Sequence, residues 1–345
     1  MRERIYRHHT MPRIPVVSKK AVAGKRVLMR VDFDVAIEEG TIVEDFRLQA
    51  NIPSMRFVLA SGGLLRLVSH RGRPNGVRQD EFSLAPLAAY CEKFLKRKVI
   101  FMCDPFDAAT MHTYCDSREV LLFENIRFWK EEEKNDLDFA RKIGRWGEVY
   151  VNEAFANSHR AHVSVDALAR TLPAYAGLHL AEEIHHLTAL LQKPKHPFVV
   201  VLGGAKLETK LPLITRFVGR ADAVLVGGMC ANTLLAARGY SMGQSEIERD
   251  PALLSSPALK NKKIMLPQDV IIVDTFKRSA HARTVAIDKV PHDKCVGDIG
   301  PKTALEFAEI ITKAATIVWN GPLGYVELAQ CRKGTATIAK AIAQS

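Results

Sequence analysis

Short hydrophobic runs alternate with helical patterns along the whole of this chain. Runs of three to five mostly apolar residues are typical of buried strands, and their alternation with helices favours a parallel sheet with crossover helices. The runs are Val27–Val31, Leu64–Val68, Val99–Met102, Val120–Phe123, Val149–Val151, Phe198–Leu202, Ala223–Val226, Val270–Val273 and Thr316–Trp319. The pattern therefore predicts an α/β fold.

One amphipathic stretch, Leu180–Lys193, separates the two sets of runs. Its apolar residues recur at helical spacing, and Pro194 and Pro197 then end the helix and restart an extended chain. We interpret this helix as a connector between two domains. The alternative is an ordinary crossover helix inside one domain.

Charged and polar side chains follow the strands of the first half. Asp32 and Asp34 come after the first run, and His70 and Arg73 come after the second. In open α/β sheets the ligand crevice lies at the carboxyl ends of the strands. One sheet edge would thus gather cationic and polar groups, which points to a small molecule with several negative charges.

Composition narrows the class of protein. The chain has 345 residues, 47% hydrophobic and 25% charged, and a formal net charge of +11. Because its basic residues are dispersed among acids, as in Lys130–Lys134, the charge favours an enzyme for anionic substrates over a nucleic-acid binder. No apolar stretch is long enough to span a membrane, and the six cysteines lack the paired spacing of a zinc site. We expect a cytoplasmic protein whose true start is Met1 or Met11.

Glycine-bearing turns follow three strands of the second half. Phe198–Leu202 runs into Gly203 and Gly204, and the two other turns contain Gly228 and Gly321. Glycines after a strand let the backbone approach a phosphate, and the next helix offers free N–H groups. Lys206 and Lys210, four residues apart, would share one helical face and suit a polyphosphate. These turns predict a nucleotide site, although the Walker A spacing is absent.

Together these motifs make the chain resemble phosphoglycerate kinase over nearly its whole length. The stretches that carry the resemblance are Arg30–Val35, Glu44–Leu48, Ser69–Gly76, Leu121–Phe128, Tyr150–Phe155, His159–His162, Leu202–Lys206, Gly300–Thr303 and Val318–Gly324. The resemblance implies two Rossmann-like domains with a cleft between them. It also implies reversible phosphoryl transfer between 1,3-bisphosphoglycerate and ADP, giving 3-phosphoglycerate and ATP in glycolysis.

The resemblance further assigns the domains and the sites. Residues 1–178 would bind 3-phosphoglycerate, 179–193 would form the connecting hinge helix, and 194–345 would bind the nucleotide with its Mg²⁺. The implied acid-site residues are Asp32, Asp34, Arg47, His70, Arg73, Arg127 and Arg160. The implied nucleotide-site residues are Gly204, Lys206, Lys210, Gly228, Asn320, Pro322 and Glu327. Arg47 and Lys206 would be catalytic, Arg47 by contacting the phosphoryl group in flight. The protein itself supplies no metal ligand in this reading, and the family resemblance suggests a monomer.

Three departures from the family pattern bear on function. Asp34 replaces an asparagine and would repel an anionic substrate, and Glu153 replaces an aspartate. The chain also ends at Ser345, before the family's later glycine-rich turns and the aspartate that contacts the metal. We therefore expect an incomplete C-terminal domain, an exposed sheet edge and a partial nucleotide site. The alternatives to an active kinase are a non-catalytic phosphoglycerate-binding protein, an inactive gene fragment and, last, a nucleic-acid binder.

Overall fold

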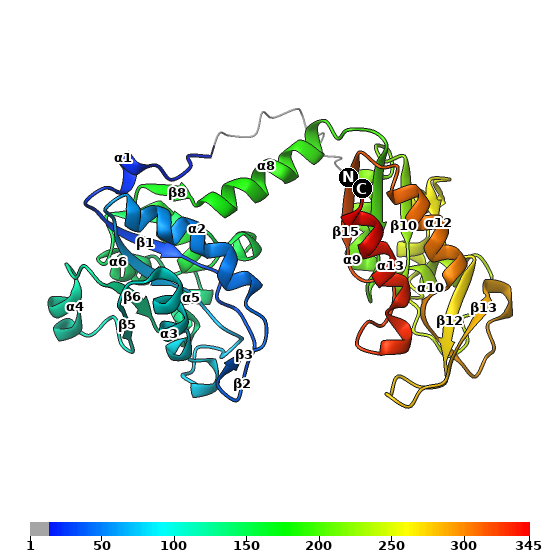
Figure 1. The fold of residues 1–345 in the computed structure, drawn as a ribbon, viewed down its shortest axis with the longest axis horizontal. Helices are drawn as coiled ribbons and strands as arrows, with labels where there is room; N and C mark the ends of the chain where they lie inside the picture. Colours follow the sequence, from blue (N-terminus) through cyan, green and yellow to red (C-terminus); the bar gives the residue numbers. More distant parts are fainter. Residues whose placement is uncertain (1–13) are drawn as a thin grey trace. The chain divides into compact units, whose positions relative to one another are not determined.

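The chain folds into two compact units, and the division between them falls between Thr188 and Ala189. The structure is a computed structural model that describes residues 14–345 (Figure 1). The choice between Met1 and Met11 as the start lies outside the described residues. Each unit has its own sheet and its own core.

The first unit contains a six-stranded sheet in which every neighbouring pair is parallel. Its strands, in the spatial order β5-β6-β4-β1-β7-β8, are Val99–Met102, Val120–Phe123, Leu64–Val68, Arg26–Arg30, Val149–Asn152 and Ala174–Ala176. The five strands predicted in this half are thus confirmed, each within one residue at either end. The sixth, β8, was missed because three residues carry too little pattern. A small hairpin, β2 (Ile37–Glu38) with β3 (Thr41–Ile42), lies outside this sheet.

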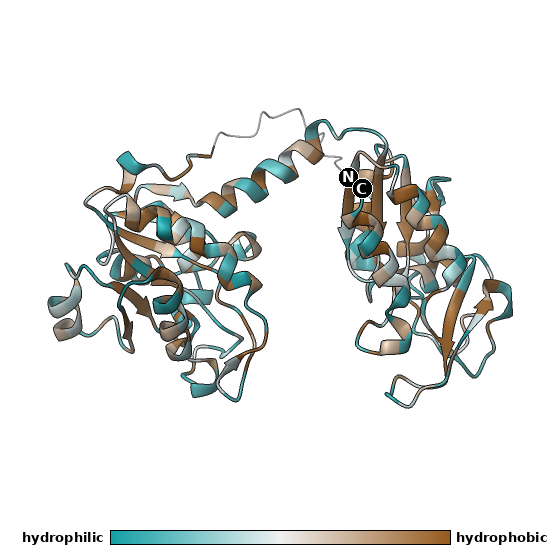
Figure 2. Ribbon diagram, viewed as in Figure 1, coloured by the Kyte–Doolittle hydropathy of each residue, from teal (hydrophilic) through white to brown (hydrophobic). Residues whose placement is uncertain are grey.

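Helices cover both faces of this sheet. They are α1 (Lys19–Val22), α2 (Phe46–Ala60), α3 (Ala85–Leu95), α4 (Ala108–Tyr114), α5 (Lys130–Glu133), α6 (Leu137–Gly144) and α7 (Leu168–Thr171). Alternate residues of β1 enter different cores: Val27 and Met29 pack with α2 and α3, whereas Leu28 packs with α6 and α7. Burial on both faces explains why these strands are mostly hydrophobic, as the largely brown colour of the sheet in Figure 2 shows.

The second unit contains two sheets. The first is parallel, in the order β11-β10-β9-β15, with strands Ile264–Met265, Ala223–Val226, Phe198–Leu202 and Thr316–Asn320. The second is antiparallel, in the order β13-β12-β14, with strands Ala282–Ala286, Asp269–Val273 and Cys295–Ile299. The helices of this unit are α9 (Leu207–Phe217), α10 (Gly228–Ala237), α11 (Pro251–Leu254), α12 (Pro301–Ile311) and α13 (Lys333–Ala343).

The prediction that Val270–Val273 belongs to a parallel sheet is wrong. This strand is the centre of the antiparallel sheet, because β13 and β14 pair with its two edges. A short hydrophobic run shows that a strand is buried but not the direction of its neighbours. The neighbour β13 is mostly exposed and carries no hydrophobic run, so its pattern does not predict a strand.

The predicted connector is helix α8, Leu178–Gln192, and the division between the units lies within it. Leu178 and Leu180 pack in the first unit, whereas Leu190 and Leu191 pack against the core of the second. Leu187 is exposed, so the predicted apolar face is not buried along its whole length. The hinge role of α8 stays a prediction. Among residues 14–345, no helix combines the length and the apolar character needed to cross a bilayer.

Candidate functional site

The carboxyl ends of β1, β4, β6 and β7 lie next to one another in the first sheet, because these strands are parallel neighbours. After β1, the strands β4, β5 and β6 are all added on one side of β1, whereas β7 and β8 are added on its other side. The strand order therefore reverses at β1. Ligands of open α/β sheets bind outside the strand ends at such a point. The polar residues that follow these strands form the first candidate site.

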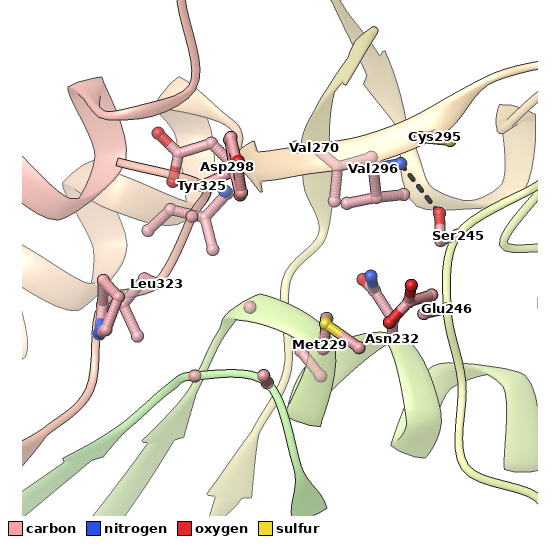
Figure 3. A pocket seen from close by; sticks show the side chains of 18 of the residues that line it. Met229, Asn232, Ser245, Glu246, Val270, Cys295, Val296, Asp298, Leu323 and Tyr325 are labelled. Atoms are coloured by element: carbon pink, nitrogen blue, oxygen red, sulfur yellow. Dashed lines mark hydrogen bonds between the residues drawn. The ribbon is translucent and has the colours of Figure 1, made fainter. Parts of the chain in front are cut away.

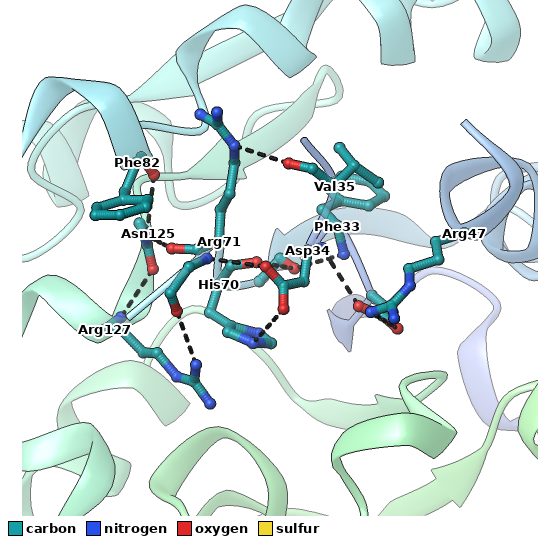
Figure 4. Close-up of polar contacts among 12 residues, drawn as sticks. Phe33, Asp34, Val35, Arg47, His70, Arg71, Phe82, Asn125 and Arg127 are labelled. Atoms are coloured by element: carbon teal, nitrogen blue, oxygen red, sulfur yellow. Dashed lines mark hydrogen bonds and ion pairs between the residues drawn. The ribbon is translucent and has the colours of Figure 1, made fainter. Parts of the chain in front are cut away.

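Asp34 and His70 are the centre of this site, as Figure 4 shows. One Asp34 oxygen accepts a hydrogen bond from the Gly72 N–H at 2.8 Å, and the other lies 3.5 Å from His70 Nε2. The second His70 nitrogen, Nδ1, lies 2.8 Å from Nη2 of Arg30. A guanidinium can only donate, so Nδ1 accepts and the His70 proton stands on Nε2, facing Asp34.

The charges of this pair follow from the same contacts. Burial lowers the pKa of His70 to about 3, so its imidazole is neutral at physiological pH. Partial burial opposes ionisation of Asp34, but hydrogen bonds from His70 and Gly72 hold the pKa of its carboxyl well below the usual range. The site therefore presents a carboxylate that two N–H groups already engage.

Arg47 stands at the start of α2 and reaches the strand end of β1. Its Nη1 lies 3.5 Å from Oδ2 of Asp32, and about half of its side chain is exposed. Asn51, one turn later on α2, fixes both partners: its amide donates to the carbonyls of Arg47 at 2.6 Å and Asp32 at 3.2 Å. Arg47 is thus a positioned cation with a free approach from solvent.

Two further arginines belong to the same site. Arg127 is buried, donates to the Gly72 carbonyl at 2.8 Å and lies 3.6 Å from Glu133. Burial lowers the pKa of Arg127, and the nearby positive charge of Arg160 adds to this effect. In the described part of the chain, Nε of Arg160 is buried and has no hydrogen-bond partner. An anion would satisfy that donor and relieve the repulsion between the two guanidinium groups.

The structure thus brings together six of the seven residues predicted for acid binding. Contacts link Asp32, Asp34, Arg47, His70 and Arg127, and electrostatic interaction links Arg160 to them. The seventh, Arg73, follows them on the loop after β4 but is exposed. The roles of all seven remain predictions.

The sequence did not identify the buried residues that orient the side chains of this site through hydrogen bonds. Buried Arg30 sets the tautomer of His70, and Asn51 joins α2 to the end of β1. Asn125, fully buried, donates to the carbonyls of Arg71 and Phe82 and so fixes the loop after β4 (Figure 4). The one available signal was the spacing of Asn51, which follows Arg47 by four residues, about one helical turn.

In the second unit, three glycine-bearing turns interlock at the ends of β9, β10 and β15. The Gly203 and Gly204 amides donate to the carbonyls of Asn320 and Pro322, and the Gly228 amide donates to the Leu323 carbonyl. A Cβ on Gly203 would lie 2.0 Å from the Pro322 oxygen. Glycine is required there because another backbone occupies the side-chain position.

A cavity of about 570 Å³ opens beside these turns (Figure 3). Four of the predicted nucleotide residues line it, namely Gly204, Gly228, Pro322 and Glu327. Its other walls come from residues that sequence reasoning did not identify, namely Asn232, Ser245, Phe276, Asp298 and Tyr325 among others. These lie on separate elements and carry no shared motif, so only the fold could reveal them.

The remaining predicted nucleotide residues lie outside the walls of the cavity. Lys210 is on α9 and donates to the side-chain oxygen of Asn320. The prediction that Lys206 and Lys210 share a helical face is wrong, because α9 begins at Leu207 and Lys206 is the N-cap with extended backbone. Lys206 is exposed at the positive end of the helix dipole, where an anionic group would be favoured.

The described residues also bear on the implied Mg²⁺. Within 14–345 there is no group of three His, Cys, Asp or Glu side chains placed to hold a metal ion. Mg²⁺ commonly binds through substrate phosphates with one or two carboxylates and several waters. A Mg²⁺ ion that arrives with a nucleotide would therefore need few ligands from the protein.

Comparison with known proteins agrees with this geometry. The model of the family "Phosphoglycerate kinase" matches residues 17–345. A phosphoglycerate kinase of Roseiflexus sp. (strain RS-1) is 41% identical over 330 residues, which cover 93% of this chain and 84% of the relative. That of Moorella thermoacetica is 40% identical over 327 residues, covering 93% and 83%.

Solved structures give the same answer for the fold. The phosphoglycerate kinase of Coxiella burnetii aligns with a TM-score of 0.79 and 34% identity, covering 94% of this chain and 84% of its own. The enzyme of Pyrococcus horikoshii OT3 aligns with a TM-score of 0.81 and 28% identity, covering 94% and 85%. The chain therefore belongs to the phosphoglycerate kinase family.

Proposed function

We propose that this chain catalyses the reversible phosphoryl transfer of its family, with the acid substrate bound by the first unit and the magnesium–nucleotide by the second. The observation that carries the proposal is the convergence of Arg47, Arg127 and Arg160 on one set of strand ends. Arginine suits a phosphorylated acid because its planar fork pairs two oxygens at once.

Each residue of the first site has a role that its geometry supports. Buried Arg127 and half-buried Arg160 would hold the anionic groups of 3-phosphoglycerate, since the unpaired, buried Nε of Arg160 needs an acceptor. Exposed Arg47 would stabilise the charge that develops on the phosphoryl group in flight. Such transfer depends on positioning and charge stabilisation more than on a protein nucleophile.

In the second unit the interlocked turns and the cavity support nucleotide binding. The cavity would take the nucleoside portion, with Glu327 near its rim. The phosphates would contact Lys210 and the N-terminus of α9, where Lys206 is the N-cap residue. Because the two substrates would bind different units, the two sites must meet for transfer, and α8, which contains the boundary between the units, is our proposed hinge.

A turnover assay tests the proposal directly. The full chain should form 1,3-bisphosphoglycerate and ADP from 3-phosphoglycerate and magnesium–ATP, followed by coupled oxidation of NADH. Binding of 3-phosphoglycerate without turnover would favour the alternative of a non-catalytic binding protein. Salt-sensitive binding to RNA or DNA that 3-phosphoglycerate does not affect would favour the nucleic-acid alternative. A glycolytic role favours a cytoplasmic location, and both this and the monomeric state stay predictions.

Replacing Asp34 with asparagine is expected to tighten 3-phosphoglycerate binding about fivefold. The carboxylate is ionised and more than one third exposed, so it repels the substrate by about 1 kcal/mol in largely aqueous surroundings. The same change should lower the free energy of unfolding by about 1–2 kcal/mol. Gly72 and His70 engage different oxygens of Asp34, and the NH₂ group that replaces one of them cannot accept a hydrogen bond. Calorimetric titration and urea unfolding measure the two effects separately.

A matched control is Asp138→Asn. It removes the same charge from an exposed residue paired with Arg141 on α6, away from these strand ends. It should leave both quantities nearly unchanged. Equal or weaker 3-phosphoglycerate binding by Asp34→Asn would show that the carboxylate does not oppose the substrate.

A further inference from the structure

Glu153 has a fully buried carboxyl group at the end of β7 that no step of the proposed reaction uses, and burial raises its pKa. Its backbone N–H donates to the Arg30 carbonyl at 2.8 Å, which fixes it to the end of β1 beside the acid site. Uncompensated burial of a carboxylate is costly, so its side chain must find donors within the protein.

Those donors come from two helices. Oε1 of Glu153 accepts from the hydroxyl of Ser54 on α2 and from the His179 N–H at 3.0 Å, while Oε2 lies 3.4 Å from the Leu180 N–H. The Ser54 hydroxyl oxygen in turn accepts from the Leu178 N–H at 2.8 Å. Glu153 and Ser54 therefore satisfy three of the free amides at the N-terminus of α8.

Space for the long acid is provided by Gly177, just before α8. A Cβ on Gly177 would lie 1.6 Å from Oε2 of Glu153. The glutamate side chain thus occupies the place of the missing side chain and reaches the first turn of the helix. An aspartate would be one methylene shorter and could not make the same set of contacts from this backbone.

These contacts join three functional segments. Ser54 lies on α2, whose first turn carries Arg47. Glu153 follows the strand beside the acid site, and α8 continues into the second unit. We propose that Glu153 is a positioning residue whose hydrogen bonds hold α2, with Arg47, and the start of α8 in place beside the acid site. Through these contacts, order at the site is transmitted to the connector helix α8. This inference rests on the proposed function.

Kinetics of Glu153→Gln, Ser54→Ala and the double variant test the proposal in the full chain. Loss of these hydrogen bonds should lower kcat about tenfold, because a small misplacement of the reacting groups slows the transfer step. The KM for 3-phosphoglycerate should change less than about twofold. The two substitutions remove parts of the same hydrogen-bond network, so the double variant should be no slower than either single variant. Unchanged kcat, additive losses or a loss confined to KM would each overturn the proposal.

Hydrogen exchange gives a second readout that does not depend on turnover. In the unaltered chain, 3-phosphoglycerate should slow exchange of the amides at 178–182, and this slowing should vanish in Glu153→Gln. If the ligand slows exchange equally in both, Glu153 does not transmit order to α8. If the unaltered chain binds but shows no turnover, the proposed function fails while exchange still decides the role of Glu153.

The matched control is Asp136→Ala. Asp136 caps α6 by accepting from the Phe139 N–H at 2.8 Å, and within residues 14–345 it has no hydrogen bond or ion pair with α2 or α8. Its loss should reduce stability without changing kcat or the response of α8. An equal fall in kcat for this control would mean that general destabilisation explains the effect of Glu153→Gln.

Discussion

Replacing Arg47 with alanine is expected to lower kcat about 10³-fold while leaving the fold intact. An arginine that stabilises the transition-state charge of phosphoryl transfer contributes at least that much. The Arg47 side chain is about half exposed and makes one ion pair, at 3.5 Å, so its removal leaves no cavity. The measurement is steady-state kinetics with thermal unfolding of the same samples.

Arg56→Ala provides the matched control. Arg56 lies on the same helix, is exposed and donates to the Phe94 carbonyl at 2.7 Å. It should retain nearly full kcat with a similar melting temperature. If Arg47→Ala also keeps its kcat and changes only the KM for 3-phosphoglycerate, Arg47 binds the ground state and does not act on the phosphoryl group.

Replacing Gly203 with alanine is expected to have the second largest effect. The added methyl group would lie 2.0 Å from the Pro322 oxygen, and that partner is backbone, which cannot swing away. The turns after β9 and β15 must separate, at a cost of about 3 kcal/mol in the free energy of unfolding. Because Gly204 and Pro322 line the cavity, the KM for ATP should rise at least about tenfold.

Gly219→Ala is the corresponding control, since a Cβ there meets nothing within 4 Å and its φ is not positive. Urea unfolding and ATP kinetics should show little change. Binding of 3-phosphoglycerate to Gly203→Ala serves as an internal check and should stay normal, because the acid site lies in the other unit. A normal KM for ATP in Gly203→Ala would argue against nucleotide binding at these turns.

The nine strand positions were predictable because most of these strands are buried, and burial leaves a short hydrophobic run in the sequence. The same local pattern failed for strand direction at Val270–Val273, which depends on partners distant in the chain. It also failed at Lys206, where the start of α9 is set by the turn after β9 rather than by residue spacing. Local pattern is informative about a strand or helix but not about its neighbours.

By itself, the sequence determined the fold class and the glycines that allow backbones to approach, and it predicted the motif residues of both candidate sites. Only the tertiary structure decided how the site residues are charged and held. Arg30 sets the proton on His70, Asn51 fixes Arg47, and Glu153 reaches from β7 to two helices. Such contacts join residues up to 99 positions apart, as between Ser54 and Glu153. Hydrogen-bond partners are chosen by proximity after folding, and proximity across elements leaves no periodic trace in the chain.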